Sequence, residues 1–288
     1  MSATIARSPT TRRAPSTVGA RISRAINNGL IVAHRNILTL TRVPTVFIFE
    51  LVQPIMFVLL FRFIYANNIA NLPAGFDYVL FLMPGIFIQN AIFGATTTAI
   101  GLAEDMKEGI IDRFRSLPMA RSAVLVGRTT FDLAKNLILV AIVLVIGYLV
   151  GFRFSNGFVN AVWMLLLVMA VGFTFSWISA SVGLSLKKVE AVQAATFTMI
   201  FPIVFVSSAF VPVVGMAPFL QVIARNNPVT HWCNLARYLA VGPGAIVDAQ
   251  THLPVNTFHA LVFLSVAWIV WLLLIFVPLS TRLYRRLT

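Results

Sequence analysis

Residues 154–186 read FSNGFVNAVWMLLLVMAVGFTFSWISASVGLSL, a run that contains no Asp, Glu, Lys or Arg. An α-helix needs about 20 mostly apolar residues to cross a hydrocarbon core about 30 Å thick, so this run can hold one crossing. Four more uncharged runs occur at 78–103, 136–152, 191–224 and 249–281. Together these runs predict an all-α protein that crosses a membrane several times.

The composition of the whole chain agrees with this interpretation. Of the 288 residues, 59% are hydrophobic and 11% are charged, and the mean hydropathy is +0.89. A soluble domain usually has about 25% charged residues, which argues against an ordinary soluble fold. A further crossing is expected at 44–65, where the apolar neighbours of Glu50 offset the cost of inserting its charge. We therefore expect six transmembrane helices, at about 44–65, 79–103, 132–152, 158–184, 191–211 and 258–280.

The positions of the basic residues predict the orientation of the chain. There are 22 Lys and Arg against 9 Asp and Glu, a net charge of +13. Seventeen of the 22 lie on the side of the predicted spans that holds both termini, and three lie on the other side. By the positive-inside rule, both termini of this multi-pass protein are expected in the cytoplasm and the spans in the plasma membrane. This asymmetry accounts for the basic charge of the chain without a nucleic-acid partner. The expected partner of the basic residues is membrane lipid.

Three segments are distinguished by composition. Residues 1–20 are rich in Ser, Thr, Pro and Arg, which predicts a disordered cytoplasmic tail. In 21–42, apolar residues recur on one helical face, which predicts an interfacial amphipathic helix that acts as an anchor or as a docking element. The remaining 43–288 form the six-span domain. Its external region, 212–255, is apolar but interrupted by five prolines, which favours short, partly re-entrant helices before the last span.

The cytoplasmic loop 104–122 has more pattern than a simple connection requires. A helix is expected from Glu104 to Leu117, because Ile110, Phe114 and Leu117 share one face while acidic residues share another. Pro118 would end this helix. Its apolar ridge packs either on a partner protein or on the inner surface of the protein itself.

Ionisable residues inside the predicted spans are the candidates for function, because they are costly to retain in a membrane. Glu50 either faces a cationic substrate or bonds to another helix, and Gln53 beside it adds to a polar notch. Arg62 lies near the end of the same span. Asp132 and Lys135, three residues apart at the inner end of the third span, are expected to pair with each other as a structural contact.

The sequence contains few of the motifs and residue clusters that catalytic sites require. It has no G-x-x-x-x-G-K-[ST] phosphate-binding loop, so the chain is not expected to hydrolyse nucleotide by itself. The four histidines are scattered, and the one cysteine, Cys233, is expected to be a buried thiol. We therefore expect no catalytic site, no metal site and no cofactor bound by this chain.

Two stretches resemble a known family. Residues 105–119, DMKEGIIDRFRSLPM, resemble the cytoplasmic loop of type-2 ABC exporter permeases, and look most like the daunorubicin-resistance branch. The second stretch comprises Phe210, Pro212, Met216, Pro218, Gln221, the sequence NPVT at 227–230, and Arg237. The resemblance extends along most of the chain. It departs from the family at 216–219, MAPF, where Met-Pro-Trp is common.

The resemblance implies the membrane subunit of an ATP-driven exporter for an amphiphile such as a drug, lipid or glycolipid. It implies two copies of a separate ABC ATPase subunit, which bind ATP and Mg, and a second permease that is identical or related. The implied ATPase-coupling residues are Glu108, Gly109, Arg113, Phe114, Leu117 and Pro118. Candidates for the substrate path between permeases are Glu50, Gln53, Phe57 and Asn90, and candidates for an external cap are Asn227, Pro228 and Arg237. The alternative is an ion-coupled secondary transporter that uses Glu50.

Overall fold

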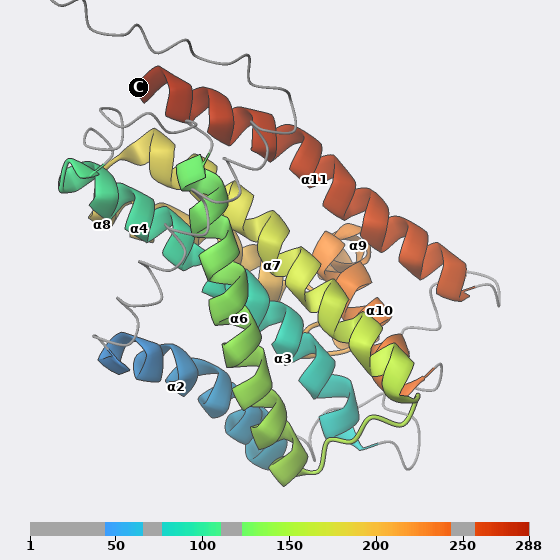
Figure 1. Ribbon diagram of the computed structural model, residues 1–288. Coiled ribbons are helices and arrows are strands. Elements are labelled where there is room, and N and C mark those ends of the chain that lie inside the picture. Colours follow the sequence, from blue (N-terminus) through green and yellow to red (C-terminus); the bar gives the residue numbers. More distant parts are fainter. Residues whose placement is uncertain (1–43, 66–76, 111–122, 243–256, 288) are drawn as a thin grey trace, which may run out of the picture.

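The computed structural model describes residues 44–65, 77–110, 123–242 and 257–287, and every regular element within these ranges is a helix (Figure 1). The elements in chain order are α2 (Pro44–Leu60), η1 (Phe61–Tyr65), α3 (Tyr78–Gly94), α4 (Thr96–Lys107), α6 (Ala123–Val150), α7 (Phe158–Leu186), α8 (Val189–Phe205), η2 (Val213–Gly215), α9 (Pro218–Asn226), α10 (Pro228–Val241) and α11 (Thr257–Leu287). The predicted all-α class is confirmed for these residues. The predicted tail 1–20 and amphipathic helix 21–42 lie outside them.

Four helical stretches in the described ranges are long and apolar enough to cross a membrane. They are Tyr78–Lys107, Gly127–Val150, Phe158–Leu186 and Phe258–Arg286, and they coincide with the predicted second, third, fourth and sixth spans. The predicted first and fifth spans correspond to α2 and α8, each of 17 residues, which is the lower limit for one crossing. The chain is therefore a multi-pass membrane protein, and the total of six spans stays a prediction.

The second span is longer than predicted and is not a single straight helix. α3 and α4 follow each other with a break at Ala95, and α4 continues to Lys107. The expected helix from Glu104 to Leu117 is wrong at its start, because Glu104 belongs to α4. Glu108 caps α4, and Gly109 follows with a φ of +68°, a left-handed conformation that glycine adopts without steric cost. The rest of the predicted helix, from 111 onward, lies outside the described residues.

The fifth predicted span also ends earlier than expected. We expected a helix over about 191–211, but α8 ends at Phe205 and the chain turns over 206–211. Pro202 lies in the last turn of α8. Beyond it the backbone leaves the helix because side chains of α10 and α3 supply its hydrogen bonds: Asn227 donates to the carbonyl of Val206, and Tyr78 donates to that of Phe210.

The helices differ strongly in how much of their surface other helices cover. Along the Tyr78–Lys107 stretch, 89% of the most apolar window is buried, whereas along Phe258–Arg286 only 11% is. α3 and α4 are therefore at the centre of the bundle, and α7 packs on both of them as well as on α11. α11 lies along the outside (Figure 1). Its uncovered apolar residues fit contact with lipid.

The two ends of the bundle differ in charge. The end of α4, the start of α6, the α7–α8 junction and the end of α11 gather at the upper left in Figure 1, and α2 starts lower on the same left side. Basic residues at this end include Lys107, Lys187, Lys188, Arg285 and Arg286. The opposite end has Arg62, Asp77 and Arg153. This asymmetry fits the orientation predicted from the basic residues, which itself stays a prediction.

The region predicted to be external contains short helices among its described residues, as expected. α9 begins with Pro218 at its first turn and exposes Phe219 and Val222. α10 begins with Pro228, is mostly buried, and packs against α3, α7 and α11. The prediction of short helices is thus confirmed for 212–242, whereas 243–256 lies outside the described residues. How deeply α9 and α10 enter the membrane stays a prediction.

Candidate functional site

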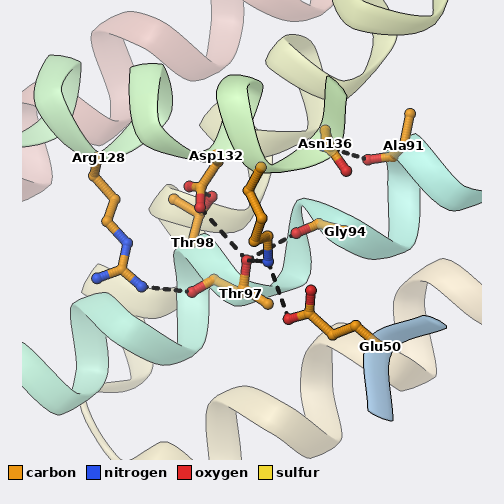
Figure 2. A network of polar contacts seen from close by, with 9 residues as sticks. Glu50, Ala91, Gly94, Thr97, Thr98, Arg128, Asp132 and Asn136 are labelled. Carbon is orange, nitrogen blue, oxygen red and sulfur yellow. Dashed lines mark hydrogen bonds and ion pairs between the residues drawn. The ribbon is translucent and has the colours of Figure 1, made fainter. Parts of the chain in front are cut away.

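A polar stripe on α6 faces α3 and α4 inside the bundle (Figure 2). Arg128, Asp132, Lys135 and Asn136 lie four, three and one residue apart, so they share one face of the helix. Asp132, Lys135 and Asn136 are each at most 3% exposed. Burial of so many polar side chains in an apolar helix requires partners on the facing helices.

The facing helices, α3 and α4, supply these partners. The guanidinium of Arg128 lies 3.6 Å from Asp105 and donates to the backbone carbonyl of Thr97 at 3.0 Å. The hydroxyl of Thr98 donates to Asp132 in a short hydrogen bond. Farther along, the amide of Asn136 donates to the carbonyl of Ala91 at 3.4 Å. α6 is thereby joined to α3 and α4 along about 12 Å of its length, from Arg128 to Asn136, at 1.5 Å per residue.

Two glycines make room for this stripe. A Cβ atom at Gly101 would lie 1.6 Å from the guanidinium of Arg128. A Cβ atom at Gly94 would lie 2.1 Å from the side-chain oxygen of Asn136. The absence of side chains at 94 and 101 therefore allows the long polar groups of α6 to reach the backbone and side chains of α3 and α4.

A fourth helix, α2, joins the network through Glu50. The ammonium of Lys135 donates to Glu50 on α2 at 3.0 Å and to the hydroxyl of Thr97 at 2.7 Å. The Thr97 hydroxyl in turn donates to the carbonyl of Gly94 at 2.8 Å and lies 3.5 Å from Asp132. The expected direct pair of Asp132 and Lys135 is wrong: Lys135 reaches across to α2, and only the Thr97 hydroxyl connects it to Asp132. Glu50 thus bonds to another helix, which was one of its two predicted roles.

The coupling residues predicted from the loop are only partly visible. Glu108 is exposed at the end of α4, and Gly109 follows it in its left-handed conformation with open space around it. Arg113, Phe114, Leu117 and Pro118 lie outside the described residues. The role of all six in coupling stays a prediction.

The candidates for the substrate path lie at different depths in the bundle. Gln53 and Phe57 are half-buried on α2, whereas Asn90 on α3 is buried. The side-chain nitrogen of Asn90 has no hydrogen-bond partner within the described ranges. Phe57 belongs to a group of aromatic rings: its ring is stacked on that of Phe210, with centroids 5.2 Å apart, and is tilted to that of Phe205, with centroids 6.0 Å apart. The structure thus groups Phe57 with aromatic residues near the end of α8.

The candidates for the external cap hold the turn 206–211 against the bundle. Asn227 caps α10 by accepting from the amide of Val229, and its own amide donates to the carbonyls of Ile203 and Val206. Pro228 occupies the first turn of α10, where a missing N–H costs nothing. Arg237 is fully buried, and its guanidinium lies 3.5 Å from the ring centroid of Phe81. These residues are brought together around one turn, although a role in transport stays a prediction for each.

The guanidinium of Arg237 serves backbone carbonyls from two directions. Its Nε donates to the carbonyl of Phe81 on α3 at 2.8 Å. Its terminal nitrogens donate to the carbonyls of Ser208 and Ala209 in the turn, and to the side chain of Asn234 one helical turn earlier on α10. The planar guanidinium of arginine carries five N–H donors, so it can donate to acceptors that lie on different sides of it. Arg237 therefore joins α10, α3 and the end of α8.

Sequence reasoning missed five members of the polar network: Thr97, Thr98, Asp105, Arg128 and Asn136. Arg128, Asp132 and Lys135 share one face of an otherwise apolar helix, and this periodicity was a usable signal for a buried polar stripe. The threonines had no comparable signal, because isolated threonines are common in membrane helices and usually bond to their own backbone. In the described ranges, no three His, Cys, Asp or Glu side chains gather as a metal site.

Comparisons with known proteins agree with this architecture. Residues 28–241 match the family model described as ABC-2 type transporter. The daunorubicin resistance ABC transporter permease protein DrrB1 of Streptomyces coeruleorubidus is 28% identical over 269 residues, 93% of this chain and 90% of that protein. A putative transport permease, ycf38, of Pyropia yezoensis is 27% identical and covers 71% of each chain. The probable doxorubicin resistance ABC transporter permease protein DrrC of Mycobacterium tuberculosis is 23% identical over 67% of this chain and 69% of its own. Since the family match covers well over half of the sequence, the chain belongs to the ABC-2 type transporter family.

Proposed function

We propose that this chain is the membrane permease subunit of an ATP-driven exporter. The observation that carries the proposal is the way α4 and α6 are joined. These two helices flank the loop 108–122, and Asp105 and Arg128 tie them together beside it. A partner that pushes on the loop would move both helices as one body. Membership of the ABC-2 type transporter family supports this interpretation.

The energy for transport is proposed to come from a separate ABC ATPase subunit. Two copies would bind ATP and Mg and act on the loop through Glu108, Gly109, Arg113, Phe114, Leu117 and Pro118. This chain would act beside a second permease, identical or related, in the plasma membrane, with six spans and both termini in the cytoplasm. ATP binding and hydrolysis would switch the pair between inward-open and outward-open arrangements, with a substrate favouring the state that it binds better.

The proposed substrate is an amphiphile taken from the cytoplasm or the inner leaflet. The names of DrrB1 and DrrC associate these relatives with resistance to daunorubicin and doxorubicin, so a drug-like amphiphile is the first class to test. Glu50, Gln53, Phe57 and Asn90 are the proposed path residues. The rings stacked beside Phe57 support a path for ligands with planar rings, because aromatic pairs favour offset-stacked contacts.

The alternative, an ion-coupled carrier that uses Glu50, has less support. Lys135 lies 3.0 Å from Glu50 and already neutralises its charge within the bundle. A carrier site needs a carboxyl group that exchanges its proton with solvent during transport. We therefore keep Glu50 as a path and linking residue of the ABC permease.

The variant Glu108→Arg tests the proposed coupling. The chain would be purified in complex with a candidate ABC ATPase subunit co-expressed with it, and the complex would be reconstituted in liposomes. We expect the variant to insert normally in the membrane, because Glu108 is exposed at the end of α4. Stimulation of ATP hydrolysis by doxorubicin should be lost, since the reversed charge lies where the ATPase is proposed to contact the loop.

The matched control is Glu190→Arg, the same charge reversal at an exposed site in the first turn of α8, at the same end of the bundle. Its stimulated hydrolysis should stay within about twofold of the wild type. Unchanged stimulation in Glu108→Arg, or a permease that does not copurify with any ATPase, would contradict the proposed function.

A further inference from the structure

The polar contacts on α6 continue without interruption from the loop-flanking end of the bundle to α2. Asp105 and Arg128 lie beside the loop, Thr98 and Asp132 follow, and Lys135 ends the series at Glu50 (Figure 2). We propose that the Glu50–Lys135 ion pair makes α2 move together with α4 and α6, so that a displacement of the loop reaches the substrate path. This inference rests on the proposed function, in which an ATPase acts on that loop.

α4 and α6 are suited to move as one body. Their polar contacts occur at two levels, Asp105 with Arg128 and Thr98 with Asp132. Sliding one helix past the other would break these contacts together, and it would leave the carboxylate of Asp132, which is fully buried, without the Thr98 hydroxyl. Buried polar groups that lose their partners are strongly disfavoured. A force on the loop is therefore expected to shift the two helices jointly.

Among the described residues, the ion pair of Glu50 and Lys135 is the polar link between α2 and α6, beside the apolar packing of α2 on α3 and α6. One oxygen of Glu50 accepts from Lys135, and its other oxygen is buried without a hydrogen-bond partner in the described part of the chain. The side chain of Lys135 is only 3% exposed. If α2 lagged behind α6, both charges would be left unpaired in a low-dielectric interior. The pair is therefore a positioning contact that holds α2 against α6 in either arrangement of the bundle.

The depth of the contact fits this role. Glu50 lies about 9 Å along α2 from Pro44, and Lys135 lies about 12 Å along α6 from Gly127, at 1.5 Å per residue. Both helices start at the end of the bundle that holds the loop (Figure 1). Phe57, two turns beyond Glu50 on α2, belongs to the proposed substrate path. The pair thus lies between the loop and Phe57, at the loop side of the proposed path.

Distances between spin labels test the inference without any substrate. In the Cys233→Ala background, cysteines would replace Met56 on α2, Ile138 on α6 and Leu274 on α11, two at a time; all three side chains are exposed. The full chain would be in complex with its ATPase, with unlabelled chain in excess. Between nucleotide-free and ATP–vanadate states we expect the 56–138 distance to stay constant and the 56–274 distance to shift by about 2 Å or more.

The neutral pair Glu50→Gln with Lys135→Met removes the attraction with little change in volume. In this variant we expect the 56–138 distribution to broaden and the nucleotide-dependent 56–274 shift to be lost. The swapped pair, Glu50→Lys with Lys135→Glu, should restore both. If the neutral variant does not fold, the swapped variant decides the question. A folded swapped variant that shows the wild-type change in the 56–274 distance supports the link. A folded swapped variant without this change overturns it.

The control is Arg62→Gln, which breaks the other ion pair of the α2–η1 segment. Arg62 lies 3.2 Å from Asp77 at the opposite end of the bundle, and both side chains are at least one-third exposed. Its distances should match those of the wild type. If the ATP-dependent change in the 56–274 distance persists in the neutral variant, the proposed link is overturned and the proposed function is not. A wild-type complex without any ATP-dependent shift overturns both the link and the proposed function.

Discussion

Arg237→Ala is expected to lower the stability of the folded permease by more than about 4 kcal/mol, because it removes several charge-assisted hydrogen bonds at once. The guanidinium is fully buried and donates to carbonyls of α3 and of the turn after α8. Without it, these carbonyls lose the charged donor in an interior from which water is excluded. The turn 206–211 would then be held to α10 by fewer contacts, such as those of Ser208 with Thr230 and Asn234. Thermal unfolding of the detergent-solubilised protein, followed by size-exclusion chromatography, measures the effect.

Arg225→Ala is the matched control for this experiment. Arg225 lies in the neighbouring helix α9, is exposed, and bonds only to Gln221 one turn earlier among the described residues. Its loss should change stability by no more than about 0.5 kcal/mol. Arg237→Lys should be intermediate, since one ammonium cannot reach acceptors that the arginine fork serves from two sides. Equal melting temperatures for the Arg225 and Arg237 alanine variants would show that the carbonyls find other donors.

Gly183→Ala is expected to destabilise the crossing of α7 and α4 by about 1–3 kcal/mol. A Cβ atom at position 183 would lie 2.6 Å from the backbone oxygen of Ala99 and 3.0 Å from its Cα. Neither atom can move without shifting the whole of α4. Alanine is favoured over glycine within a helix by about 1 kcal/mol, so a net loss of stability would show that the close approach of two backbones dominates.

Gly172→Ala on the same helix provides the comparison. The nearest atom to its added Cβ would be the side-chain nitrogen of Asn136 at 3.1 Å, and the next would be an ordinary contact with Ala91 at 3.5 Å. A side-chain amide can adjust by a few tenths of an ångström, so this variant should be near neutral. Both variants would be compared by melting temperature in the same detergent. A Gly183 variant as stable as the Gly172 variant would contradict the tight crossing.

The long spans could be predicted from the sequence because charge is excluded from a hydrocarbon core. Runs without Asp, Glu, Lys or Arg located four stretches that are helical and long enough to cross. The ends of helices were less predictable. Glu104 lies within α4 and does not begin a new helix, and α8 ends at Phe205 instead of at about 211. These ends depend on which distant side chains take over the hydrogen bonds of the backbone, as Asn227 does after α8.

The candidate site was predictable only in its ionisable members. Glu50 was recognised because a carboxylate within a span is costly, whereas Asp132 and Lys135 were noted only as a structural pair on one helix. Their pairing was predicted wrongly, since sequence spacing favours partners on the same helix, whereas Lys135 pairs with Glu50 on α2. Arg237 was noted as part of a resembling stretch, without any indication that it is fully buried.

By itself, the sequence determined that this chain is helical, lies in a membrane and carries its positive charge mainly on one side, because hydropathy and charge act on each segment independently of its neighbours. Only the tertiary structure decided which polar groups meet. Lys135 lies 85 residues from Glu50 along the chain, and Arg237 lies 156 residues from Phe81. Such contacts form only after the helices have packed, since in an interior of low dielectric each buried charge or donor must find whichever partner the packing brings within reach.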